Sequence, residues 1–391
     1  MYAVVNSKKL KDVVKQFKSV GGVAVLVKKF GQVLYLMSYH MPNNCYNGGG
    51  VPQYYPCGSL LSISVKLELT GPFQNGNFEF YTTLEDLKAG LSCASGGCVK
   101  ISFEDGVASC SGSYQQTLHL VDASESGIVF KDIDHDDSIV FSVPVESLKF
   151  ARPFANEDDW SREDFMNICV EEGGVVATDG HALGVKDWHM GENAELQYQV
   201  PIPGKVADVI VNSGTDAAII SAFTKTIEVL NPLKNEKEKR TNVVGVFITA
   251  GDYLFTIAVE KEFGFPNFKK VFPERYDNQF IIDANAWCST ISSLAKGFNY
   301  PHLTVTDEPG NFVFNIHEIR AKKGKVALGD RQAKLPRDKF VDHAWSAFKC
   351  DARLLCKALK AQDSTHTMIH VQDELVVLES WAGKSIVMQM Q

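Results

Sequence analysis

Two short stretches of this sequence combine residue types that can do chemistry. The first holds Asp132, Asp134, His135 and Asp136. Hard divalent cations bind carboxylate oxygens, so one hypothesis is a metal-dependent hydrolase built on this cluster. The stretch lacks the glycine and the final glutamate of a calcium-binding loop. It also falls where a boundary between domains is expected, and we favour its interpretation as a solvated acidic linker.

The second stretch holds Asp179 and His181 on either side of a glycine, a pair that acid–base catalysis can use. Asp-Gly between two apolar β-branched runs is, however, a strong hairpin signal, because glycine accepts positive φ without a Cβ clash. Aspartate in such a turn commonly accepts hydrogen bonds from the local backbone. No Ser or Cys nucleophile stands in a recognised context such as G-x-S-x-G. We therefore predict a non-catalytic protein.

Composition bounds the class of protein. The chain has 391 residues, 45% hydrophobic and 22% charged, which is ordinary for globular proteins and leaves room for about two to four domains. Its net charge of −8 argues against a generally basic nucleic-acid binder but allows basic groups gathered on one face. Nine cysteines without a C-x-x-C spacing indicate neither a zinc site nor a disulfide scaffold. We expect no cofactor, no signal peptide and no membrane span.

The expected secondary structure repeats along the chain. The order strand, helix, strands, helix, strands occurs three times, starting near residues 1, 138 and 278. Side chains that can cap helix starts stand at four places, namely Asn6 or Ser7, Thr83, Asp283 and Asp351. We predict an α+β fold of three repeated domains, each with two helices and antiparallel sheets, at residues 1–134, 135–275 and 276–391. Irregular segments are expected at 41–58, 234–240 and 320–339.

The predicted helices also share basic residues. On the helix 8–20, an apolar face of Leu10, Val13, Val14 and Phe17 lies beside an arc of lysines. A solvated lysine face is the simplest interpretation of one such helix. If all the basic helices were only solvated faces, the chain would be an oligomeric binding protein without DNA, which is one hypothesis. Because basic residues recur on the helices of an acidic protein, we favour a shared surface for DNA. The residues predicted to face DNA are Lys8, Lys11, Lys15, Lys18, Lys88, Lys149, Arg152, Lys205, Lys296, Arg353, Lys357 and Lys360.

Three separated segments resemble one family and occur in its order. They are Ala177-Thr-Asp-Gly-His-Ala-Leu183, Phe265-Pro-Asn-Phe-Lys-Lys-Val-Phe-Pro273 and Ser385-Ile-Val-Met-Gln-Met-Gln391. The segments resemble the bacterial DNA polymerase III β subunit, the β sliding clamp, in a divergent form such as a bacteriophage or an unusual bacterium would encode. The resemblance implies three clamp-type domains of like topology in each chain, with the helices inside a ring. Two chains would close head to tail, so that each homodimer subunit forms half of a closed ring.

The resemblance also implies a function without catalysis. A sliding clamp is a processivity factor that encircles duplex DNA and tethers the replicative DNA polymerase, with the help of a clamp loader. Its contacts with DNA would be electrostatic and independent of sequence, because basic helices would face the phosphates. Such a protein would work at the replication fork, in the cytoplasm of a bacterium or of a phage-infected host. No cofactor is implied.

The family binds short peptides from the polymerase and the clamp loader in an apolar pocket. The resemblance places in that pocket Met166, Thr178, Gly180, His181, Leu183, Pro266, Lys270, Val271, Ile386, Met388 and Met390. Methionine adapts to varied apolar partners, and the backbone near a glycine can be approached closely. Three positions depart from the family pattern: Ala182 replaces an arginine, Gln389 replaces a proline, and Gln391 ends the sequence without a leucine. These departures put the preferred peptide in question.

Aromatic residues complete the sequence-based expectations. Four tryptophans are expected in the core or at an interface, because no alternation of basic and aromatic residues surrounds them. They are Trp188, Trp287, Trp345 and Trp381. Candidates for a contact between subunits are Tyr114, Leu118 and Leu294.

Overall fold

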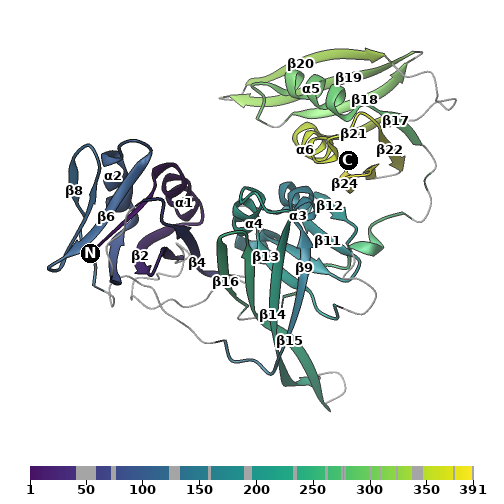
Figure 1. The fold of residues 1–391 in the computed structure, drawn as a ribbon. Helices are drawn as coiled ribbons and strands as arrows, with labels where there is room; N and C mark the ends of the chain where they lie inside the picture. Colours follow the sequence, from purple (N-terminus) through teal and green to yellow (C-terminus); the bar gives the residue numbers. More distant parts are fainter. Residues whose placement is uncertain are drawn as a thin grey trace. The chain divides into compact units, whose positions relative to one another are not determined.

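The computed structural model describes residues 1–40, 59–71, 76–122, 133–156, 160–188, 196–231, 236–259, 263–273, 276, 279–299, 301–308, 310–322, 325–336, 347–372 and 375–389. Two compact units are present: residues 1–145 with 198–264, and residues 146–197 with 265–391. Both units combine helices with antiparallel strands (Figure 1). None of the described helices is long and apolar enough to cross a membrane.

The described elements follow one order three times: strand, helix, four strands, helix, three strands. The first repeat contains β1 (Tyr2–Asn6), α1 (Ser7–Ser19), β2 (Gly22–Phe30), β3 (Val33–His40), β4 (Ser59–Glu68), β5 (Phe78–Thr83), α2 (Leu84–Gly90), β6 (Cys98–Glu104), β7 (Val107–Ser111) and β8 (Gln115–Thr117). The second contains β9 (Asp137–Pro144), α3 (Val145–Ala151), β10 (Asn167–Glu171), β11 (Gly174–Thr178), β12 (Ala182–Lys186), β13 (Val200–Pro203), α4 (Gly204–Val211), β14 (Ala217–Asn231), β15 (Glu236–Ala250) and β16 (Tyr253–Ala258). The third contains β17 (Gln279–Ile282), α5 (Ala284–Ala295), β18 (His302–Glu308), β19 (Asn311–Lys322), β20 (Lys325–Pro336), β21 (Phe348–Asp351), α6 (Ala352–Gln362), β22 (Thr367–Gln372), β23 (Leu375–Ser380) and β24 (Gly383–Met388).

This order confirms the predicted α+β class with two helices and antiparallel sheets in each repeat. The repeats begin at Tyr2, Asp137 and Gln279, one residue from the predicted starts. The boundaries at 134/135 and 275/276 stay a prediction.

Two segments that were expected to be irregular are strands instead. Strand β15 begins at Glu236, which pairs with Asn231 at the end of β14, and β19 and β20 cover 320–322 and 325–336. The rest of the two segments, 234–235, 323–324 and 337–339, lies outside the described residues. These hairpin arms are rich in charged residues, so they lack the apolar alternation by which a half-buried strand is recognised. The expected loop at 41–58 lies outside the described residues.

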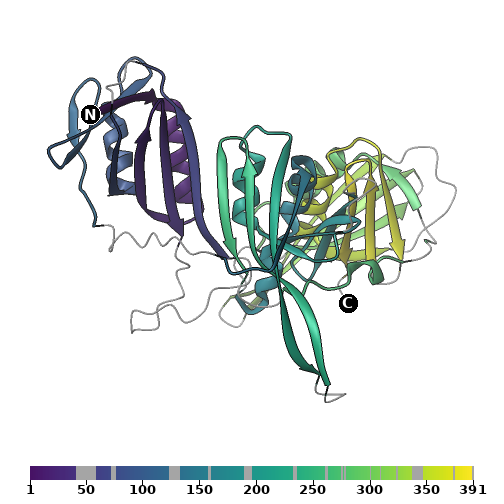
Figure 2. The same ribbon diagram turned by 60° about the horizontal axis from the view of Figure 1, so that its bottom comes forward.

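The first unit contains two antiparallel sheets, with strand orders β1-β6-β7-β8 and β5-β2-β3-β4-β16-β15-β14-β9. Alternation decides which face is buried: along β5, Phe78 and Phe80 are buried while Glu79 is exposed. The Phe80 ring stacks on Phe103 of β6 with centroids 5.6 Å apart. Side chains from both sheets therefore fill one core. Helices α1 and α2 pack against strands of both sheets (Figure 2).

The second unit contains strands in the order β10-β11-β12-β24-β23-β22-β17 and a second sheet in the order β20-β19-β18-β21. Helices α5 and α6 pack on each other and against strands of these sheets. Strand β12 pairs with β24, with Leu183 opposite Ile386. The fourth strand of one repeat thus pairs with the last strand of the next, and β4 pairs with β16 by the same rule.

Side-chain caps start four of the helices. Asn6 accepts hydrogen bonds from the backbone N–H groups of Lys8 and Lys9, both at 3.0 Å. The same kind of cap starts α2, α5 and α6, at Thr83, Asp283 and Asp351. Each cap satisfies N–H groups that have no partner inside the helix, and all four were predicted. The buried face of α1 includes the predicted Leu10, Val13, Val14 and Phe17.

The tryptophans do not share one environment. Trp287 is 2% exposed and meets Phe312 and Phe314 edge-on, with ring centroids 5.0 and 4.9 Å away. Trp188 is also buried, which confirms the core prediction for both. Trp381 is 71% exposed and is not a core residue. Trp345 lies outside the described residues.

Candidate functional site

The predicted lysine stripe lies on the solvent side of α1. All four of its members are exposed, namely Lys8, Lys11, Lys15 and Lys18. Lys88 on α2 is exposed too and lines a cavity of about 600 Å³ together with Lys18. The structure therefore brings basic side chains from both helices of the first repeat to one surface. Lys205 is exposed in the first turn of α4, and Arg152 is half-buried in the short 3₁₀ helix η2 (Arg152–Phe154).

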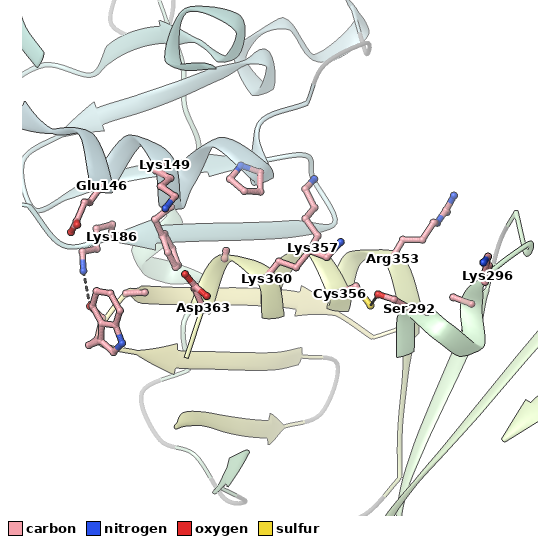
Figure 3. Close-up of a pocket in the computed structure, with 17 residues that line it drawn as sticks. Glu146, Lys149, Lys186, Ser292, Lys296, Arg353, Cys356, Lys357, Lys360 and Asp363 are labelled. Atoms are coloured by element: carbon pink, nitrogen blue, oxygen red, sulfur yellow. Dashed lines mark hydrogen bonds between the residues drawn. The ribbon is translucent and has the colours of Figure 1, made fainter. Parts of the chain in front are cut away.

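A cavity of about 680 Å³ in the second unit gathers more of the predicted residues (Figure 3). Its walls come from α3, α5, α6, the end of β12 and the β23–β24 turn. The cations among its described lining residues are Lys149, Lys186, Lys296, Arg353, Lys357 and Lys360. The carboxylates among them are Glu146 and Asp363, so positive charge is in clear excess. Sequence reasoning missed Lys186, because it lies at the end of a strand and belongs to no helical stripe.

Arg353 is tied to the cap of its own helix. Its Nη2 lies 2.7 Å from Oδ2 of Asp351 and its Nε lies 3.2 Å from Oδ1. Burial alone would raise the pKa of the Asp351 carboxyl, but hydrogen bonds from the Arg353 side chain and backbone outweigh it and leave that pKa below its ordinary value. The guanidinium remains about half exposed, with 54% of the side chain open to solvent. It can therefore meet a phosphate without leaving the helix cap.

Lys357 connects α6 to the Asp-Gly turn. Its Nζ donates to Oδ2 of Asp179 at 2.8 Å, and the side chains are 27% and 14% exposed. The other carboxylate oxygen of Asp179 accepts the backbone N–H groups of His181 and Ala182 at 2.9 and 2.7 Å. The backbone N–H groups that Oδ1 of Asp179 accepts are the local hydrogen bonds that the turn interpretation predicted, and Oδ2 adds a contact with α6. The sequence carried no signal that Lys357 would be the partner, since the two residues lie 178 positions apart.

Replacing Asp179 by alanine should destabilise the second unit by about 3 kcal/mol, because hydrogen bonds to charged groups contribute about 1.5–3 kcal/mol each and Lys357 would stay half-buried without its anion. Urea unfolding of the full chain measures the loss. Asp283→Ala is the matched control, since Asp283 also accepts two backbone N–H groups, and it should cost about 1 kcal/mol as an ordinary helix cap. Equal losses for the two variants would contradict a structural role for the Lys357 contact.

The Asp-Gly turn and the C-terminal strand meet, although about 200 residues separate them in sequence. Within the turn, Thr178 Oγ1 donates to the Ala182 carbonyl at 2.7 Å and accepts the Gly180 N–H at 3.0 Å. Gly180 has φ +86°, the conformation expected for this turn. The Met388 N–H then donates to the His181 carbonyl at 3.0 Å. Residues from the first and third of the resembling segments therefore form one continuous edge.

The middle segment is anchored nearby through aromatic contacts. Phe265 meets Phe165 edge-on at 6.3 Å, and the guanidinium of Arg162 lies 5.9 Å from the same Phe165 ring. The Arg162 guanidinium also stands directly over Gly180, where a Cβ would come within 2.2 Å of its Nη1. Sequence reasoning missed Arg162, which carries no recognisable motif.

The predicted pocket residues differ in burial: some are buried in the fold, and others expose apolar side chains to solvent. Thr178, Leu183 and Ile386 are buried, whereas Val271 and Met388 are 42% and 45% exposed. Met166 is half-buried, and the remaining described members are exposed or half-buried, namely Gly180, His181, Pro266 and Lys270. Met390 lies outside the described residues. Their shared role in binding a peptide stays a prediction.

The acidic cluster is engaged in local structure. Lys225 of β14 pairs with Asp134, and this hydrogen bond lowers the pKa of the Asp134 carboxyl. Oδ2 of Asp136 accepts the Thr226 N–H at 2.8 Å, and the His135 ring packs against Phe223 with centroids 4.6 Å apart. Among the described residues, which exclude Asp132, no group of three or more His, Cys, Asp or Glu side chains could hold a metal ion. The described side chains thus anchor the segment before β9 to β14.

Comparison with solved structures identifies the fold. No family model and no curated protein matches the sequence. The β clamp of Helicobacter pylori, solved with a DNA ligase peptide, matches with a TM-score of 0.70 at 12% identity over 100% of both chains. The pol III β of Caulobacter crescentus matches at 0.70 and 14% over 100% of both. The DNA polymerase III β subunit of Thermotoga maritima matches at 0.67 and 15%, covering 100% of this chain and 99% of that one. Over its whole length, this chain therefore has the fold of the bacterial DNA polymerase III β clamps.

Proposed function

We propose that this protein is a DNA sliding clamp, a non-catalytic processivity factor that encircles duplex DNA and tethers a replicative DNA polymerase. The observation that carries the proposal is the recurrence of exposed basic residues on the helices of a clamp fold whose net charge is −8. Helix α1 alone presents five exposed lysines, four of them in the predicted stripe, and the cavity beside α6 gathers six cations. Such groups contact phosphates without reading bases. Weak contacts of this kind suit a protein that must slide.

The sheet edges support closure by a second copy of the chain. Within the chain, the fourth strand of a repeat pairs with the last strand of the next repeat, in β4–β16 and in β12–β24. The sheet orders end on β20, the fourth strand of the third repeat, and on β8, the last strand of the first. Pairing β20 of one chain with β8 of another would repeat the internal junction. Two such pairings close a head-to-tail ring, and exposed sheet edges favour this kind of addition.

The surface around the Asp-Gly turn would bind partner peptides. Val271 and Met388 expose apolar side chains next to the buried Leu183 and Ile386, which suits short apolar segments of a polymerase or a clamp loader. The related fold in Helicobacter pylori was solved with a DNA ligase peptide. No cofactor is required for these roles, and the protein would act in the cytoplasm at the replication fork.

A topological assay tests the proposal. The protein is mixed with nicked circular duplex DNA and passed through gel filtration at a salt concentration that removes simple electrostatic binders. We expect it to stay with the circle and to leave when one restriction cut linearises the DNA. Its native mass should be twice 43.2 kDa. Equal retention on circular and linear DNA, or a stable monomer, would refute encirclement.

A further inference from the structure

One tryptophan is exposed beside the cationic cavity. Trp381 lies in the β23–β24 turn, between the paired Ser380 and Gly383, and is 71% exposed. A large aromatic side chain is normally buried, since burial of its apolar surface stabilises the fold. Trp188 and Trp287 follow that rule at 5% and 2% exposed. An exposed indole in a fixed turn is therefore a candidate contact for another molecule.

Lys186 lies beside this indole, and other basic side chains line the same cavity. Nζ of Lys186 donates to the Trp381 carbonyl at 2.6 Å and lies 5.8 Å from the centroid of its ring. Trp381 lines the same cavity as Lys149 and Lys360, and Figure 3 shows these two lysines on opposite helices, α3 and α6. Glu146 and Asp363 also line this part of the cavity, but the cations outnumber the carboxylates. The structure thus combines a stacking face with positive charge.

We propose that Trp381 and the adjacent lysines form a binding site for single-stranded DNA. An unpaired base would stack on the indole while its neighbouring phosphates contact Lys149, Lys186 and Lys360. Proteins that bind single strands combine an aromatic platform with a basic groove, because every base has a π-face and every nucleotide a phosphate. Base pairs inside a duplex are already stacked, so duplex DNA can use the lysines but not the indole. The site goes beyond encirclement of duplex DNA and does not require it.

Fluorescence anisotropy with a labelled (dT)20 oligonucleotide tests the site in the full-length protein. We expect Trp381→Ala to weaken binding about tenfold or more, the usual effect of removing one stacking contact. Trp381→Phe keeps an aromatic face and should retain most of the affinity. Phe30→Ala is the matched control, since Phe30 is another strongly exposed aromatic residue, 61% open to solvent, in the other unit. It should leave (dT)20 binding unchanged.

Three outcomes would overturn the proposal. The first is wild-type affinity in Trp381→Ala, and the second is an equal loss in Phe30→Ala. The third is saturation by the mononucleotide dTMP at the same concentrations, which would indicate a nucleotide pocket instead of a strand site. Retention of Trp381→Ala on nicked circular duplex is measured in parallel and should match the wild type. The two measurements therefore test the two proposals separately. (dT)20 binding tests the single-strand site, and retention on the nicked circle tests encirclement.

Discussion

Replacing Lys8, Lys11 and Lys15 together by glutamate should weaken binding to a short duplex about a hundredfold at low salt. Each phosphate that a protein neutralises contributes about 0.9 to the slope of log K against log salt, so the triple variant should also flatten that slope by up to about three. The fold should survive, because the three side chains are exposed and the buried face of α1 is untouched. The first turn of α1 has no acidic residue, and a carboxylate there interacts favourably with the helix dipole. Loss of binding could then not be attributed to unfolding.

The matched control reverses the same amount of charge elsewhere in the first unit. Lys66→Glu, Lys100→Glu and Lys239→Glu replace exposed lysines that lie outside α1. This control should keep most of the affinity if α1 faces DNA. Duplex anisotropy over a salt series, with circular dichroism to check the fold, compares the two triples. Equal losses would mean that only net charge matters, and unchanged binding in both would mean that the stripe is a solvated face.

Replacing Gly184 by alanine should destabilise the protein by about 3 kcal/mol or more, at the upper end of the cost of overpacking a core. Gly184 lies in β12, and a Cβ there would come within 2.2 Å of the Phe154 ring. Phe154 is fully buried, so the ring has no solvent-filled space to move into. Strand β12 pairs with both β11 and β24, which also prevents the backbone from moving away. Urea unfolding measures the loss.

A glycine on the neighbouring strand provides the control. At Gly174 in β11 the nearest atom to an added Cβ is a Val185 methyl at 3.3 Å, a contact that small shifts relieve. Gly174→Ala should therefore change stability by less than about 1 kcal/mol, since alanine also reduces the freedom of the unfolded chain. In the double variant Gly184→Ala with Phe154→Leu, the losses should be clearly less than additive. Additive losses would show that the Phe154 ring is not the cause.

Local rules account for what sequence reasoning predicted correctly. A capping side chain acts within three residues, as Asn6 does on Lys9, and a helix face is decided by spacing, as with Leu10 and Phe17. The repeated order of elements is the sum of such local signals. It was therefore predictable without knowing which strands pair.

Contacts across long sequence distances were not predictable. The ion pair of Lys357 with Asp179 joins residues 178 positions apart, and nothing near either residue indicates it. The predicted contact of Lys357 with DNA stays a prediction. Lys186 and Trp381 are in contact although 195 positions separate them. The sequence around Trp381 shows no alternation of basic and aromatic residues, and it therefore could not indicate that a lysine lies beside the indole. The charged start of β15 from Glu236 to Arg240 was mistaken for a loop, because pairing with β14, and not burial, keeps it extended.

The β4–β16 and β12–β24 junctions join repeats that belong to one polypeptide. Their effective concentration is set by the connecting chain and does not change on dilution. In the proposed ring, only the seams between β20 and β8 would be bimolecular and would follow mass action. The ring would therefore open only at its two identical subunit interfaces. A clamp loader would need to recognise only one kind of interface.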